Sequence, residues 1–212
     1  MKRYFLLLMF VGLSPFAIAQ HFGGLQYSPI FLKNTGQNFN WSLPEYTPDL
    51  NETTIGYSVG YQGLLFPDKR FSFGYGFNYV KTSYRYLDDS YYLTSGTPGN
   101  ERIGIQVTYQ DFEVPLTLRW NLLKKSKFQP YLSLAPVLII PIKTQEDYLY
   151  LNNSTEPFPN SVNRKLGITG EIGAGLNYHI TDKLIINLHM SYRQQTSDIH
   201  RFGVGLGFIF RF

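Results

Sequence analysis

Residues 202–212 read FGVGLGFIFRF. Large apolar residues occupy the even-numbered positions, and Gly203, Gly205 and Gly207 stand between them. Successive side chains of a β-strand point to opposite faces, so this alternation predicts a strand with one apolar face and one face of very small residues.

The same two-residue period recurs along most of the chain. Clear examples are residues 55–61, 71–79, 166–178 and 184–192, where apolar residues alternate with Gly, Ser, Thr and Asn. No long stripe of period 3.6 accompanies them. We therefore predict an all-β protein with eight strands near residues 21–32, 53–66, 71–86, 103–121, 128–143, 164–180, 184–195 and 202–212.

The connections between these strands alternate in length. Long segments (33–52, 87–102, 144–163) and the shorter 196–201 loop alternate with turns at 67–70, 122–127 and 181–183. Nothing in the architecture of a soluble sandwich requires long and short loops to alternate. Outer-membrane barrels, by contrast, have short periplasmic turns and longer external loops. Small residues on the second face suit the crowded interior of a narrow barrel. We predict an eight-stranded antiparallel up-and-down transmembrane β-barrel, multi-pass in the outer membrane, with both termini periplasmic and Phe212 as part of an insertion signal.

Composition agrees with this class. The 212 residues are 16% charged, against roughly 25% in soluble domains, and include 17 Tyr, 17 Phe and no Cys. Without cysteine, the chain has no disulfide, no thiolate metal site and no lipoprotein anchor. His21, His179 and His200 are scattered without the spacing of metal ligands, so we predict neither a metal nor a cofactor.

The first nineteen residues resemble a cleaved secretory signal. Lys2 and Arg3 precede a short apolar stretch at 4–13, and Ala17-Ile18-Ala19 offers the small residues of a cleavage site. We predict a signal peptide at 1–19 and a barrel domain at 20–212. Cleavage removes two positive charges from a net +4, and the balance left does not indicate a nucleic-acid partner.

Three prolines interrupt the predicted strands. Pro115, Pro136 and Pro141 lack the N–H that a ladder needs, and the apolar phase also changes between residues 107 and 114. A bulge between Tyr109 and Pro115 would explain the change of phase.

Two pieces of sequence resemble the PorT-like outer-membrane β-barrel family of Bacteroidetes. Residues 109–120 read YQDFEVPLTLRW, and residues 127–131 read KFQPY after a short basic turn. Ala135-Pro136 departs from the family pattern, in which Gly more often precedes that proline. The resemblance implies an eight-stranded outer-membrane barrel and little about activity, with a secretion system as one possible context.

The predicted lumen holds several charged residues. If Ile180 pairs with Leu184, Glu171 lies opposite Arg193, and opposite charges in that position attract. Asp111, Glu113 and Arg119 are expected to join them in an internal charge network. Such a network can act as a gate or proton path, or can simply fill a narrow barrel with paired charges, and we favour the second interpretation.

Two further groups of residues are candidates for function. His189 and Ser191 resemble the His-x-Ser pair of lipid A deacylases, but Tyr192 replaces the Asn of that pattern and the neighbouring apolar residues occupy the lipid face. In the long loops, aromatic side chains suit a partner, glycan or lipopolysaccharide, or else the headgroup layer: Trp41, Tyr46, Tyr148, Tyr150 and Phe158.

The sequence therefore predicts a non-enzymatic outer-membrane protein with a structural or binding role, as one subunit of a larger envelope assembly. Its expected partners are outer-membrane lipid, lipopolysaccharide and another envelope protein. The alternatives are a small channel for hydrophobic or other small solutes and a lipid A-modifying hydrolase.

Overall fold

The computed structural model describes residues 21–34, 54–87, 102–123, 126–150, 155–157, 164–194 and 199–211. The predicted signal peptide at 1–19 lies outside these residues. The strands are β1 (His21–Asn34), β2 (Thr54–Leu65), β3 (Phe71–Leu87), β4 (Arg102–Asn121), β5 (Phe128–Tyr150), β6 (Thr155–Pro157), β7 (Gly167–Thr181), β8 (Leu184–Gln194) and β9 (Ile199–Arg211).

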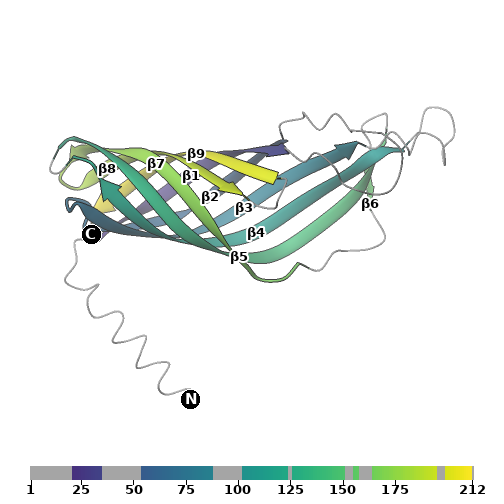
Figure 1. Ribbon diagram of the computed structural model, residues 1–212, viewed down its shortest axis with the longest axis horizontal. Helices are drawn as coiled ribbons and strands as arrows, with labels where there is room; N and C mark the ends of the chain where they lie inside the picture. The colour runs from purple at the N-terminus through teal and green to yellow at the C-terminus, as the bar shows by residue number, and fades with distance from the viewer. Residues whose placement is uncertain are drawn as a thin grey trace, which may run out of the picture.

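Eight of these strands form a closed antiparallel barrel (Figure 1). Hydrogen bonds connect them in the order β4-β3-β2-β1-β9-β8-β7-β5, and β4 pairs with β5 to close the ring. The three-residue β6 pairs only with the end of β5. The predicted eight-stranded up-and-down barrel is confirmed. Within the described ranges, no helix is long and apolar enough to cross a membrane.

The apolar side chains of the barrel face outward and its polar side chains face inward. Leu25, Leu116 and Ile168 have exposed fractions of 70%, 58% and 76%, whereas Ser58 and Asn78 are buried. On β3 the outward apolar residues run from Phe71 to Tyr79, which at a strand tilt of about 40° spans roughly 20 Å, near the height of a membrane belt. The outer surface is therefore built for lipid.

One of the short turns is held by a buried asparagine. Phe66 adopts a left-handed backbone (φ 57°), and Lys69 N–H donates to Phe66 O at 3.0 Å. At the end of β4, Asn121 Nδ2 lies within hydrogen-bonding distance of Pro67 O (3.0 Å), Lys69 O (2.7 Å) and Ser72 Oγ (3.3 Å). This side chain ties the β2–β3 turn to β4.

Replacing Asn121 with alanine is expected to destabilise the barrel by about 1–3 kcal/mol, because buried carbonyl groups of the turn lose their donor. The measurement is the free energy of unfolding in denaturant with the protein in detergent micelles. Thr181→Ala is the control, since that hydroxyl accepts a single exposed bond from Lys183 N. Equal, small losses in both variants would contradict the role of Asn121.

The β7–β8 turn differs from the prediction. Thr181, and not Ile180, pairs with Leu184, so Asp182 and Lys183 form the turn and Ile180 is a bulged residue. Beyond the bulge the pairing returns to the predicted register, for example Ile172 with Tyr192. One extra residue in the strand compensates for one fewer in the turn.

The predicted loop at 144–163 is wrong in its first part. β5 continues to Tyr150, and β6 pairs with its residues 147–149. β7 pairs with β5 only as far as Ile139, whereas β4 follows β5 to its end. As a result β3, β4 and β5 project beyond the ends of β7 and β9 (Figure 1). Residues 143–147 are all polar, so they lack the alternation by which the other strands were predicted. This part of β5 lies above the lipid-facing zone.

The predicted bulge lies on a different strand. The β3–β4 register runs unchanged from Phe71–Trp120 to Leu87–Gly104, so β4 needs no extra residue there against β3. Instead Gln110 pairs with Lys143 and Asp111 with Pro141, which leaves Ile142 of β5 as the extra residue. The apolar phase of β4 changes because its inward face becomes apolar at Val107, which is buried.

Candidate functional site

The interior of the barrel has a polar middle between two apolar clusters. Near the short turns, Phe22, Leu64, Ile185 and Ile209 form one buried cluster. Toward the long connections, Ile30, Leu32, Val80 and Tyr84 form another, with Tyr109 packed against it. Glu113, Arg193 and Arg201 are buried between these layers, so the candidate chemistry lies at mid-height.

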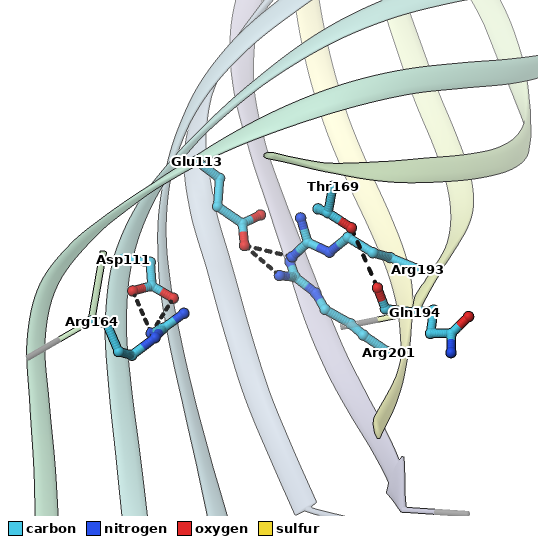
Figure 2. A network of polar contacts seen from close by, with 7 residues as sticks. All are labelled: Asp111, Glu113, Arg164, Thr169, Arg193, Gln194 and Arg201. Atoms are coloured by element: carbon cyan, nitrogen blue, oxygen red, sulfur yellow. Dashed lines mark hydrogen bonds and ion pairs between the residues drawn. The ribbon is translucent and has the colours of Figure 1, made fainter. Parts of the chain in front are cut away.

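Glu113 binds two arginines across the lumen. Its Oε1 accepts from Arg193 Nη2 at 2.5 Å and from Arg201 Nη1 at 2.6 Å (Figure 2). Glu113 stands on β4 and Arg201 on β9, and three strands separate β4 from β9 by either route around the ring. All three side chains are buried. The three residues, named here the cross-lumen triad, therefore join opposite walls of the barrel.

The triad replaces the ion pair that the sequence suggests. The β7–β8 register does place Glu171 next to Arg193, as its neighbours Ile172 and Tyr192 show. The Arg193 guanidinium nevertheless binds Glu113, and Glu171 forms no ion pair with a described residue. Arg193 and Arg201 are direct cross-strand partners, so a shared carboxylate offsets the repulsion between like charges. A long arginine side chain reaches the far wall of so narrow a lumen.

Asp111 forms a second ion pair with a residue that sequence reasoning missed. Arg164 Nη1 lies 2.8 Å and 3.0 Å from the two carboxylate oxygens of Asp111 (Figure 2), and its guanidinium carbon lies 4.3 Å from the centroid of the Tyr109 ring. Arg164 precedes β7, where no alternation marks it as an inward residue. Arg201 was missed as well, although extending the Gly203–Gly207 alternation by one step would have placed it inside.

Arg119 belongs to the lumen but not to this ion-pair network. It is buried, and its guanidinium carbon lies 4.5 Å from the centroid of the Tyr131 ring. Nearby, Asn187 Nδ2 donates to Tyr131 Oη at 2.9 Å and to Asn177 Oδ1 at 2.7 Å. This lower polar layer fills the lumen with side chains that bond to one another.

A small polar cavity of about 30 Å³ lies beside the triad, which is enough for about two waters. His189 and Ser191 both line it, but no hydrogen bond joins them, and His189 Nε2 lies 3.1 Å from Gln26 Nε2. The remaining lining residues are Gln26, Ser28, Ser58, Asn78, Glu113, Pro115, Val137, Glu171, Arg201 and Gly203. Leu188 and Met190 occupy the lipid face instead, so lipid does not meet the His-Ser pair.

Two of the aromatic loop candidates lie in a strand. Tyr148 is half-buried in β5, and Tyr150 is buried with its hydroxyl donating to Glu156 Oε2 at 2.6 Å. The assignment of Tyr150 to an exposed loop is therefore wrong, because β5 and β6 form a hairpin around it. Trp41, Tyr46 and Phe158 lie outside the described residues.

A closed barrel with an apolar exterior and a polar, filled interior defines an outer-membrane β-barrel protein. The chain belongs to the outer membrane protein beta-barrel domain family, whose model matches residues 22–193. The protein is thus placed in the outer membrane. No curated protein matches the sequence.

Solved structures of outer-membrane barrels share the fold at low sequence identity. The chain is similar to OprG from Pseudomonas aeruginosa (10% identity, TM-score 0.52, covering 92% of this chain and 96% of that one). It is also similar to AlkL in lipid bilayers (13%, 0.53, 92% and 90%) and to Ail, the attachment invasion locus protein of Yersinia pestis (12%, 0.50, 92% and 99%). These similarities concern the fold.

Proposed function

We propose that this protein is a non-enzymatic barrel with a plugged lumen, that it anchors a binding surface at its long-connection end, and that it works as one subunit of a larger envelope assembly. Its short turns and both termini face the periplasm in this proposal. The motif resemblance to the PorT-like family of Bacteroidetes supports an envelope assembly as the context.

The observation that carries the proposal is the cross-lumen triad. Glu113, Arg193 and Arg201 occupy the middle of the lumen with their charges bonded to each other. Apolar clusters lie on either side of them along the barrel. An ion would have to displace a charged, hydrogen-bonded side chain and pass two apolar layers, so the interior serves as a filled core.

The extended strands support a binding role. β3, β4 and β5 continue above the lipid-facing zone, and they carry Tyr148 near the β5–β6 hairpin. Binding residues commonly lie at the end of a rigid scaffold. Expected ligands at this end are lipopolysaccharide and another envelope protein.

The small-channel alternative depends on the polar cavity, which offers polar groups but space for little more than water. The hydrolase alternative requires His189 to activate Ser191 against a lipid ester, and both residues face the lumen. We therefore favour the plugged scaffold.

The purified protein in planar bilayers is expected to show no steady conductance steps in concentrated KCl, because the triad and apolar layers block hydrated ions. A porin added to the same bilayer at the end of the recording confirms that open pores are detected. Reproducible, long-lived steps from the protein alone would contradict the plugged lumen.

The binding role is tested by site-specific photo-crosslinking in intact cells. A photoreactive residue at Tyr148 is expected to give a discrete protein or lipopolysaccharide adduct. The same residue at Met190, on the lipid face, serves as the control. Identical lipid-only labelling at both positions would argue against a partner at this end.

A further inference from the structure

The short-turn end of the barrel has a rim of exposed cations. Lys69, Arg70, Lys127, Lys183 and Arg211 are exposed, and none forms an ion pair with a described residue. Asp68 and Asp182 are the acidic residues of the same turns. We name the five cations the basic rim. They exceed the acidic groups beside them, so this edge of the barrel carries a positive potential.

The basic rim lies directly beside a ring of exposed aromatic residues. Arg70 precedes Phe71, Lys127 precedes Phe128, and Arg211 follows Phe210. These three aromatic side chains have exposed fractions of 54%, 54% and 48%. Aromatic residues of membrane barrels mark the level of the lipid headgroups. The cations that flank them therefore stand at the depth of the lipid phosphates.

Two contacts position residues of the basic rim at the barrel mouth. The guanidinium carbon of Arg70 lies 5.9 Å from the ring centroid of Trp120, itself a cross-strand partner of Phe71. On the other side, Arg211 N–H donates to Lys183 O at 2.8 Å, so these two residues are neighbours. Arg70 thus lies at the membrane edge beside β3, whereas the Arg211 guanidinium carbon lies 5.9 Å from the ring centroid of Phe22, on the lumen side of the mouth.

The charge balance of the sequence is opposite at the other end. The long connections at 35–53 and 88–101 contain six acidic residues and no Lys or Arg: Glu45, Asp49, Glu52, Asp88, Asp89 and Glu101. Within these two segments the net charge is therefore negative, whereas the basic rim is positive and attracts anionic lipid.

From this placement we propose that the basic rim binds the headgroups of acidic phospholipids, such as phosphatidylglycerol, in the leaflet that faces the short turns. Naming that leaflet as the periplasmic one depends on the proposed orientation, but lipid binding itself does not. Each phosphate gains charge-assisted hydrogen bonds from an unpaired Lys or Arg, while the neighbouring aromatic ring contacts the upper acyl chain.

The test uses the full-length mature protein in dodecyl maltoside micelles, with bound lipid counted by native mass spectrometry. Phosphatidylglycerol and phosphatidylcholine of the same acyl chains are titrated in parallel, and purified lipopolysaccharide forms a third arm. The rim variant is Arg70→Gln/Lys127→Gln/Lys183→Gln. The control, Lys81→Gln/Lys143→Gln/Lys165→Gln, removes the same number of charges away from the rim.

The wild type and the control are expected to retain phosphatidylglycerol at least tenfold better than phosphatidylcholine, and the rim variant is expected to lose that preference, since each cation near an anionic lipid contributes about fivefold. Equal retention of both phospholipids by the wild type would overturn the proposal. So would a preference that survives in the rim variant, or lipopolysaccharide binding that depends on the rim more strongly than phosphatidylglycerol binding does.

Folding is checked by the gel shift on boiling. If the triple variant does not fold, the single variants Lys127→Gln and Lys183→Gln replace it, each with an expected loss of about fivefold. These outcomes are independent of the bilayer recordings, so a conducting lumen and an inert rim would be distinguished.

Discussion

Replacing Glu113 with leucine is expected to destabilise the barrel by about 3–5 kcal/mol, because two buried arginines lose their shared carboxylate. Arg193 and Arg201 are 1% and 7% exposed and are cross-strand neighbours, so they would then repel each other without a counter-ion. Glu113→Gln is expected to lose less, since an amide oxygen still accepts a hydrogen bond.

The measurement is the denaturant midpoint and slope in detergent micelles or vesicles. Glu171→Gln is the informative comparison, because the strand register alone would make Glu171 the partner of Arg193. A loss of under about 1 kcal/mol is expected for it. If Glu171→Gln were the more damaging change, Arg193 would be paired along the wall and not across the lumen.

Replacing Gly205 with valine is expected to cost about 1–3 kcal/mol through overpacking. A Cβ at this position would overlap the ring of His189, its direct cross-strand partner. His189 lines the polar cavity and its Nε2 lies 3.1 Å from Gln26 Nε2, so a ring displaced by the valine would give up this contact. The inward face of β9 therefore needs glycine for close approach and not for backbone freedom.

Gly170→Val is the matched control, because a Cβ there meets nothing within 4 Å and the side chain would point to lipid. That change is expected to be neutral or slightly stabilising. The double variant Gly205→Val/His189→Ala should recover much of the stability, since it removes the ring that the valine strikes. Failure of that rescue would show that the cost has another source, such as backbone displacement.

Sequence reasoning predicted the fold well because the relevant signal is local. In residues 71–79 and 202–210, the alternation of apolar and small residues indicates which side chains face the lipid and which face the lumen. It failed at the upper part of β5, where residues 143–147 are polar on both faces. Above the membrane zone a strand no longer needs an apolar side, so alternation of this kind disappears.

The turns show the same limit on a smaller scale. The β7–β8 register beyond the turn agreed with the prediction, yet the turn itself contains two residues and a bulge at Ile180. Similarly, the apolar phase of β4 changes because its inward face becomes apolar at Val107. The bulged residue is Ile142 of the neighbouring strand β5. Bulges depend on how two strands fit together, which neither strand specifies alone.

The sequence by itself determined the class of protein: alternating strands, small inward residues and connections of alternating length require an outer-membrane barrel. Each of these is a property of short segments and of steric or solvation preferences that act on every residue separately. Only the tertiary structure decided how the buried charges pair. Glu113 meets Arg193 and Arg201 from 80 and 88 residues away along the chain, and Asp111 meets Arg164 at a distance of 53 residues. Which residues pair depends on the width of the lumen relative to the length of an arginine side chain. That width is set only when the barrel closes.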